Sequence, residues 1–276
     1  MKQVNWIIAA FFGLLLLVGS CKTDEDTNPS TKGNCYVTGV KSDGDFSINN
    51  FEYNSDNLIS KILIFNYDST VQTGRVEFTY NGSLPKEMLL YNDTTVKAKF
   101  TFHYDSRELP DTINMQVPDE TGTLVNFGYY LLVFDGDMLK EVTMNVPVSG
   151  NIYVTSKDQY TYSGNNVTSK EHYEFSYETS DLELLYTYTL EYDAKRNPFS
   201  GVGFDFLVFL GDNSMTYLSQ NNPTKVTVKD ASGEVLGDKS YSVTMDYNDN
   251  DYPVRIIKEF VGDFSPETDY LTYDCQ

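Results

Sequence analysis

The sequence predicts an all-β fold, an antiparallel up-and-down meander of roughly 12–15 strands that is strongly curved or closed like a barrel. Three observations predict it. The chain has 22 Tyr and 17 Phe in 276 residues against one Trp, and aromatic side chains suit a pleated, half-buried surface. Several segments alternate strictly between apolar and polar residues. A weak internal repeat places turn-forming residues between these segments.

Alternation with a period of two marks five segments as antiparallel strands with one apolar and one polar face. In the first segment Val76, Phe78 and Tyr80 face one way, with polar residues between them. The same pattern continues over residues 98–104, 173–177, 186–192 and 241–247.

The repeat consists of an aromatic residue, then in most copies Asp or Asn, then a few turn residues and an aliphatic residue. An Asp or Asn side chain makes such a turn by accepting hydrogen bonds from its own backbone, so each copy predicts a hairpin. Repeated hairpins imply that each strand pairs with its sequence neighbour. The copies span Tyr53–Ile62, Tyr80–Met88, Tyr104–Ile113, Phe134–Val142, Tyr162–Val167, Tyr192–Val202 and Tyr247–Ile256.

One stretch breaks the strand pattern. Phe204, Phe206 and Leu207 follow one another without alternation, which predicts one short helical insertion near residues 199–220. The strand pattern restarts at Asn221. Because no Pro- or Ser-rich linker divides residues 35–276, we predict a single all-β domain over that range.

Residues 1–20 are predicted to be a lipoprotein signal peptide. Lys2 precedes the apolar run Trp6–Val18, which is too short to cross a bilayer core of about 30 Å as a helix but suits a cleaved leader. The ending Val-Gly-Ser-Cys at residues 18–21 resembles the lipobox of bacterial lipoproteins. That resemblance implies cleavage before Cys21 and lipidation of Cys21. The alternative is ordinary cleavage nearby, which leaves Cys21 as a free thiol.

Residues 21–34 read as a flexible acidic tether, because no apolar residue follows Lys22 before Cys35. The start of this segment, Lys followed by acidic residues, resembles the export signal of surface lipoproteins in Bacteroidetes. We therefore expect an outer-membrane lipoprotein, periplasmic or surface-exposed, whose partner is the membrane through an acyl anchor on Cys21. The formal charge of −20 repels phosphate backbones and argues against nucleic-acid binding.

The other two cysteines predict a disulfide. Once Cys21 carries lipid, Cys35 and Cys275 are the remaining thiols, and an exported protein resides in an oxidising compartment. They lie at the two ends of the predicted domain. A bond between them would make the first and last strands near neighbours, so the sheet would curl or close. The alternative is two unpaired buried thiols.

Three stretches carry a family resemblance: EYDAKRNPF, SQNNPTKVTV and MDYNDNDYPVRI. With the lipobox and the Tyr-Asp hairpins, they resemble Bacteroidetes lipoproteins of unknown function that have a porin-like β fold. The resemblance extends over the mature chain. Its motifs are structural, so it implies a fold and no activity.

No catalytic, metal-binding or cofactor-binding residue is assigned. The oxygen-rich turn at Asp246–Asp251 has Asp251 where a calcium-binding EF-hand loop requires Gly. His103 and His172 are isolated and are interpreted as solvated or hydrogen-bonded strand residues. A carboxylate pair could hydrolyse glycosides, but 40 acidic residues do not single out a pair.

The leading hypothesis is a membrane-anchored, non-enzymatic binding module for a glycan or an envelope protein. Tyr53, Tyr104 and Tyr192 lie at hairpin ends and are the candidate ligand-contact aromatics around a mouth. One rival is a structural envelope protein whose tyrosines fill the interior, and a weaker one is a glycoside-type hydrolase. A membrane pore is disfavoured, because the chain needs a lipid anchor and ends in Asp-Cys-Gln rather than an aromatic residue.

Overall fold

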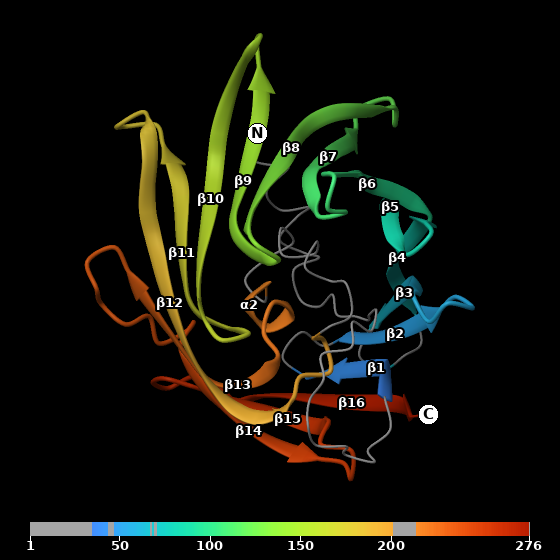
Figure 1. Ribbon diagram of the computed structural model, residues 1–276, viewed down its shortest axis with the longest axis vertical. Helices are drawn as coiled ribbons and strands as arrows, with labels where there is room; N and C mark the ends of the chain where they lie inside the picture. The colour runs from blue at the N-terminus through green and yellow to red at the C-terminus, as the bar shows by residue number, and fades with distance from the viewer. Residues whose placement is uncertain (1–34, 44–46, 67, 69–70, 201–213, 276) are drawn as a thin grey trace.

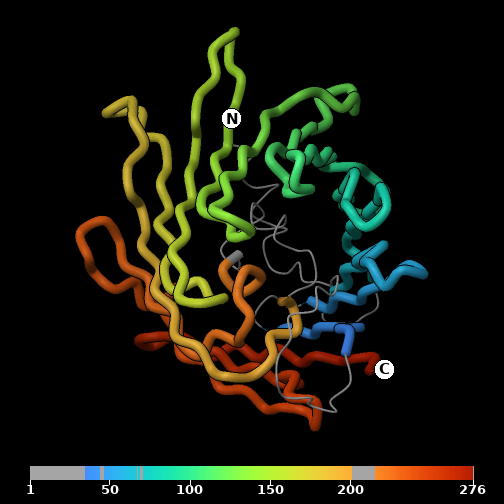
Figure 2. Tube along the Cα trace, viewed as in Figure 1, coloured from blue at the N-terminus to red at the C-terminus, as the bar shows by residue number. Residues whose placement is uncertain are grey.

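The computed structural model describes residues 35–43, 47–66, 68, 71–200 and 214–275. Sixteen antiparallel strands form one closed barrel, in which each strand pairs with its sequence neighbours and the last strand pairs with the first. Figures 1 and 2 show this ring of strands. The strands are β1 (Cys35–Ser42), β2 (Ser47–Tyr53), β3 (Ile59–Asn66), β4 (Gln72–Asn81), β5 (Leu84–Asn92), β6 (Thr95–Tyr104), β7 (Pro110–Pro118), β8 (Leu124–Asp135), β9 (Met138–Val148), β10 (Asn151–Ser163), β11 (Asn166–Ser176), β12 (Asp181–Arg196), β13 (Asn221–Asp230), β14 (Tyr241–Tyr247), β15 (Pro253–Phe260) and β16 (Glu267–Cys275).

The predicted up-and-down meander is confirmed, and the sheet closes fully. The number of strands exceeds the roughly 12–15 expected from common strand lengths. Strands such as β3 and β8 carry apolar residues on both faces, so alternation does not reveal them in the sequence. On β8, for example, Leu131 and Val133 are exposed.

The described part of the predicted insertion holds one short helix, α2 (Ser214–Tyr217). The remainder of that prediction, including Phe204, Phe206 and Leu207, lies outside the described residues. Phe199 and Met215 flank the undescribed segment and both belong to the buried core. Within the described ranges, no helix is long and apolar enough to cross a membrane.

The apolar faces of the strands meet inside the barrel. Val37, Ile62, Phe100, Ile113 and Val228 are buried members of one cluster that draws on strands all around the ring. A single cluster contributed from all sides of a closed barrel must occupy its interior.

Polar residues occupy the opposite faces of the strands. Cross-strand ion pairs form there, with Lys99 Nζ 2.6 Å from Glu87 Oε1 and Lys225 Nζ 2.9 Å from Glu191 Oε1.

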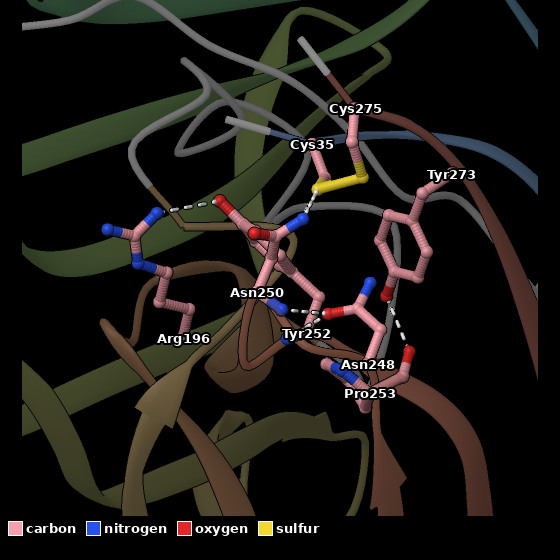
Figure 3. Close-up of a disulfide and its surroundings, with 8 residues drawn as sticks. All are labelled: Cys35, Arg196, Asn248, Asn250, Tyr252, Pro253, Tyr273 and Cys275. Atoms are coloured by element: carbon pink, nitrogen blue, oxygen red, sulfur yellow. Dashed lines mark hydrogen bonds between the residues drawn. A yellow bond between two sulfur atoms is a disulfide. The ribbon is translucent and has the colours of Figure 1, made fainter. Parts of the chain in front are cut away.

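The predicted disulfide between Cys35 and Cys275 is present. The two residues are directly opposite each other at the end of the β1–β16 ladder, and Figure 3 shows the bond beside the β14–β15 turn. The bond joins positions separated by 240 residues. The two ends of the domain therefore meet and close the barrel, as the cysteine positions predicted.

The aromatic residues of the sequence repeat form a ring of hydrogen bonds around one end of the barrel. The hydroxyl of Tyr80, at the end of β4, donates to the carbonyl oxygen of Ile59 in β3 at 2.6 Å. Ile59 is in turn the cross-strand partner of Tyr53. We call this set of bonds the tyrosine ring. Its other members are Tyr53 to Val37 (2.5 Å), Tyr104 to Pro85 (2.5 Å), Tyr162 to Leu139 (2.8 Å), Tyr192 to Val167 (2.5 Å) and Tyr273 to Pro253 (2.6 Å).

The tyrosine ring ties each hairpin to the next, because every acceptor residue is the cross-strand partner of the preceding aromatic residue. Val37 pairs with Tyr273, so the bond from Tyr53 carries the ring across the β16–β1 closure. A β-bulge follows each acceptor position, which bends the strand there. Burial raises the pKa of the phenols of Tyr53, Tyr80, Tyr104, Tyr192 and Tyr273, to about 12 for Tyr192. They stay protonated donors at neutral pH.

The ring departs from its pattern at two positions. Phe134 ends β8 where the other hairpins have tyrosine, so the carbonyl of Pro110 in β7 receives no hydroxyl from it. Tyr247 ends β14, but its hydroxyl donates to the carboxylate of Asp193 instead of to Pro223, the partner of Tyr192.

Replacing Phe134 by Tyr is expected to stabilise the barrel by about 1 kcal/mol, the usual net value of one intramolecular hydrogen bond. The added hydroxyl would complete the ring at the carbonyl of Pro110. Urea unfolding measures the change. Tyr104→Phe is the reverse control and should lower the free energy of unfolding by a similar amount. A neutral or destabilising Phe134→Tyr variant would show that the pattern does not extend to β8.

Candidate functional site

The barrel has its shortest ladder between β13 and β14. Among the described strand pairs this ladder has the fewest partners, Lys225 with Ser242 and Val226 with Tyr241. It begins two residues after Pro223, as the β5–β6 and β15–β16 ladders begin two residues after Pro85 and Pro253. It ends early because the N–H of Val228 donates to the hydroxyl of Ser240 and the carbonyl oxygen of Val228 accepts from the N–H of Leu236.

A cavity of about 70 Å³ lies on the inner side of the barrel wall near this ladder. Its lining includes Pro223 of β13, the inward-facing Val243 and Met245 of β14, and Ile256 of β15. Three aromatic side chains, Phe199, Tyr217 and Tyr241, form further parts of its wall. A mostly apolar cavity with a few polar groups is the usual form of a small-molecule site.

The polar groups of this cavity include a buried ion pair. Lys258 Nζ lies 3.3 Å from Asp269 Oδ2 and 3.7 Å from Glu267 Oε2. Burial disfavours the ammonium, but the carboxylates of Asp269 and Glu267 outweigh that effect and raise the pKa of Lys258. Lys258 therefore stays charged at neutral pH. The second oxygen of Asp269, Oδ1, is buried and has no hydrogen-bond partner among the described residues.

Asp269 is not among the residues expected from the sequence, although its position carries a signal. Asp269 pairs with Ile256 on one side and with Ser42 on the other. It alternates with Leu271 and Tyr273, which places a carboxylate on the apolar face of its strand. A charged residue in an apolar-face position is the pattern that would have identified it.

Side chains of β12 connect β13 and β14 at the end that carries the tyrosine ring. Asp193 accepts the Tyr247 hydroxyl of β14 and, at 3.2 Å, the backbone N–H of Asn222 in β13. Lys195 Nζ forms an ion pair with Asp251 in the β14–β15 turn at 2.7 Å. At that end β12 thus links β14 to β13 through side chains.

A second charged cluster lies inside the barrel on β10 and β11. His172 Nδ1 lies 2.6 Å from Asp158 Oδ1, and Lys170 Nζ lies 3.8 Å from Asp158 Oδ2. Lys170 is 1% exposed, and its ammonium lies 4.5 Å from the ring centroid of Tyr188. His172 Nε2 also contacts Glu174 at 3.4 Å. This is a buried ion network in an otherwise apolar interior.

The network alters the titration of its members. Burial disfavours the imidazolium of His172, but hydrogen bonds to Asp158 and Glu174 outweigh burial and raise its pKa to about 9. Burial works against the Asp158 carboxylate as well, but Lys170 and His172 lower its pKa overall. At neutral pH the network holds both a cationic imidazolium and an anionic carboxylate. The sequence showed His172 as an isolated residue because Asp158, its closest partner, is adjacent to it only across strands.

The candidate ligand-contact aromatics occupy the tyrosine ring. The hydroxyls of Tyr53, Tyr104 and Tyr192 are engaged with backbone carbonyls, and Tyr192 also bonds the hydroxyl of Ser219 at 2.8 Å. They belong to three separate hairpins and do not line the cavity. Ligand contact through their ring faces stays a prediction.

Two further expectations concern anchoring and metals. Cys21, the predicted lipidation site, lies outside the described residues, as do the signal peptide and the tether. Within the part of the chain that the structure describes, no three His, Cys, Asp or Glu residues gather closely enough to hold a metal ion.

The comparisons with known proteins show a similarity of fold. No family model and no curated protein matches the chain. Among solved structures, a porin-like protein from Bacteroides uniformis ATCC 8492 matches with a TM-score of 0.54 at 11% identity, covering 86% of this chain and 98% of that one. A porin-like protein from Bacteroides vulgatus ATCC 8482 matches with a TM-score of 0.42 at 12% identity, covering 87% and 99%. The first of these likenesses agrees with the porin-like β fold that the sequence motifs implied.

Proposed function

We propose that the chain is a non-enzymatic, lipid-anchored protein of the bacterial envelope that docks a partner protein through hairpin tips at one end of its barrel. The observation that supports it is an exposed aromatic surface on two neighbouring hairpins, β9–β10 and β11–β12. Figure 1 shows these hairpins extending beyond the ring of strands. We call this surface the tip patch and define it as Ile152, Tyr153, Phe175 and Tyr177.

The tip patch is held together by its own aromatic contacts. Tyr153 and Phe175 meet edge to face at 6.3 Å between ring centroids, and Phe175 and Tyr177 do so at 5.3 Å. Tyr177 is 84% exposed and Ile152 is 61% exposed. Contiguous exposed aromatic side chains of this kind mark protein-interaction sites.

The barrel topology places the tip patch away from the tether. Cys35 begins β1 at the end of the barrel that carries the tyrosine ring, since Val37 pairs with Tyr273. The β9–β10 and β11–β12 turns follow odd-numbered strands, so they lie at the opposite end. An anchor on Cys21 would reach the domain through Cys35, which leaves the tips free to meet a partner.

Charge around the tip patch indicates the chemistry of that partner. Glu178, Asp181 and Glu183 are exposed beside it, and the whole chain carries a formal charge of −20. An anionic lipid surface would be repelled. An apolar pocket bordered by Lys or Arg on an envelope protein would match an aromatic centre with an acidic border.

Site-specific photocrosslinking in living cells tests the proposal. A benzophenone amino acid at position 177 is expected to crosslink one envelope protein, whereas the same residue at position 270 should not. Tyr270 is a matched control because it is 45% exposed on the wall of β16. The captured protein, once purified, should bind the Tyr177→Ser variant at least about tenfold more weakly, as for the loss of an interface hot spot.

The anchor is tested in the same cells. Cys21→Ser should release the protein from the membrane fraction and abolish the crosslink, because anchoring concentrates the two partners. A crosslink of equal strength from positions 177 and 270, or membrane retention of Cys21→Ser, would contradict the proposal.

A further inference from the structure

We infer that the partner docked at the tip patch adds an extended, basic segment as a new strand along the free edge of β10, over residues 151–154. This inference rests on the proposed docking function and names the form of the segment that the tip patch receives. The edge lies on the side of β10 that faces β11.

The tip of the β9–β10 hairpin projects beyond the neighbouring hairpins. On one side the β10–β11 ladder ends at Ser156 with Glu174, whereas β10 continues to Asn151. On the other side the β8–β9 ladder ends at Tyr129 with Asn145, and β9 continues beyond that pair. Figure 1 shows this hairpin reaching past the ends of β11 and β12. Among the described residues, the last residues of β9 and β10 therefore form ladder pairs only with each other.

Backbone groups of β10 point to the open side of this tip. Met144 directs its carbonyl oxygen toward β10, where it accepts the hydroxyl of Thr155 at 3.3 Å. Because backbone direction alternates along a strand, Val146 also faces β10, opposite Tyr153. On β10, Tyr153 therefore bonds β9, and Ile152 beside it directs its N–H and its C=O to the open side.

The two edges of the tip differ in their protection against pairing. On β9, Pro147 lies opposite Ile152, and proline has no N–H to offer an incoming strand. On β10, residues 151–154 read Asn-Ile-Tyr-Val and hold no proline, glycine or charged residue. Val154 faces the open side with Ile152, since the two residues flank Tyr153. An edge of β-branched residues with free backbone groups is a template for another strand.

Neighbouring hairpins at this end of the barrel carry edge protection. β6, β8 and β12 also extend past the last pairs of their ladders with β7, β9 and β13. The extension of β6 includes Lys97, that of β8 has a bulge at Phe127, and that of β12 includes Asp181 and Glu183. Charges and bulges discourage strand addition, so β10 is the edge on which we expect it.

Charge beside the edge selects a basic segment. Glu174, at the end of the β10–β11 ladder, has 60% of its side chain exposed, and Glu178, Asp181 and Glu183 are exposed on the adjacent hairpin. A strand added to β10 would lie beside these carboxylates, which attract Lys or Arg side chains. A second copy of this chain, with its formal charge of −20, would be repelled.

The tip patch supplies side-chain contacts for the same segment. The rings of Tyr153 and Phe175 meet at 6.3 Å between centroids, which joins the free edge to the β11–β12 hairpin. Side chains on one face of an added strand would pack against these rings while its backbone bonds Ile152 and Val154. Strand addition takes its affinity from main-chain bonds and its specificity from alternate side chains.

Peptide display on the purified mature chain tests the inference without the partner. Short random peptides displayed on phage are the probe. Selected peptides should combine β-branched residues with Lys or Arg, and should bind Ile152→Pro at least about tenfold more weakly than Ile152→Ala, as expected for a lost hydrogen bond. Both variants remove the isoleucine side chain, but only proline removes the N–H at the free edge. Tyr270→Ser, on the wall of β16, should bind as the wild type does.

If Ile152→Pro fails to fold, Val154→Pro and Val154→Ala make the same comparison. Equal binding of the proline and alanine variants, or a selection without peptides that distinguish them, would overturn strand addition. A dimer of the chain alone that the proline variant abolishes would also overturn it, because a second copy would then occupy the edge. Crosslinking at position 177 is scored separately. A crosslink without such peptides supports docking and overturns strand addition, whereas such peptides without a crosslink support the free edge and contradict docking at the tip patch.

Discussion

Loss of the Cys35–Cys275 disulfide is expected to lower the free energy of unfolding by about 5 kcal/mol, the chain-entropy value for so long a loop. The bond closes a loop over a sequence separation of 240 residues. It also lies at the end of the β1–β16 ladder, the pairing in the barrel with the greatest sequence separation. Without it, the first and last strands must find each other from the two ends of the domain, and the loop-closure entropy opposes that pairing.

Urea unfolding of the oxidised protein, the reduced protein and the Cys35→Ala/Cys275→Ala double variant measures this effect. The reduced protein and the double variant should have the same free energy of unfolding, which would exclude an effect of the alanine side chains themselves. The Phe134→Tyr barrel, with both cysteines intact, is the matched control for an unrelated change at the same end. An unfolding midpoint that does not move on reduction would contradict the account of closure.

Asp158→Asn is expected to destabilise the barrel by about 3–5 kcal/mol, the usual effect of removing one partner of a buried ion pair. It leaves Lys170 buried beside a neutral amide and removes the carboxylate that accepts from His172. A triple variant, Asp158→Leu, Lys170→Met and His172→Phe, should recover much of the loss, because no buried charge then lacks its partner. Glu87→Gln, at an exterior ion pair with Lys99, should change stability by less than about 1 kcal/mol. Equal losses at the two sites would contradict the interior placement of the network.

The same network predicts a pH dependence. The pKa of His172 is raised from 6.5 in the unfolded chain to about 9 in the fold. The contribution of His172 to stability is therefore complete below pH 6.5 and is lost as the pH rises through about 9. Unfolding measured across this window should show that slope in the wild type and lose it in His172→Phe. The absence of a slope in the wild type would contradict a cationic His172.

Much of the fold was readable in the sequence because it rests on local rules. Alternation marked strands such as residues 98–104, and the Tyr-Asp repeat marked the turns. The Asn54 and Asp105 side chains accept backbone N–H groups two and four residues ahead, as their turn chemistry requires. The cysteine positions anticipated the closure.

The site was not readable because it depends on contacts across strands. The bond from Tyr247 to Asp193 and the pairing of Asp158 with His172 join residues that the sequence separates by 54 and 14 positions. The repeat placed the tyrosines at hairpin ends, but the carbonyl group that each hydroxyl bonds belongs to the neighbouring hairpin. Which residues lie opposite each other depends on the register between strands, which the bulges set and a single sequence does not reveal.

The tyrosine ring and the ladders close the barrel all around, and we expect the closure to be weakest between β13 and β14, whose ladder has two pairs. Hydrogen–deuterium exchange read by mass spectrometry tests this claim most directly. Amides in peptides covering β13 and β14 are expected to exchange faster than those of β5 and β6, whose ladder runs from Asn92–Thr95 to Glu87–Thr101. Equal protection of the two regions would contradict a weak seam between β13 and β14.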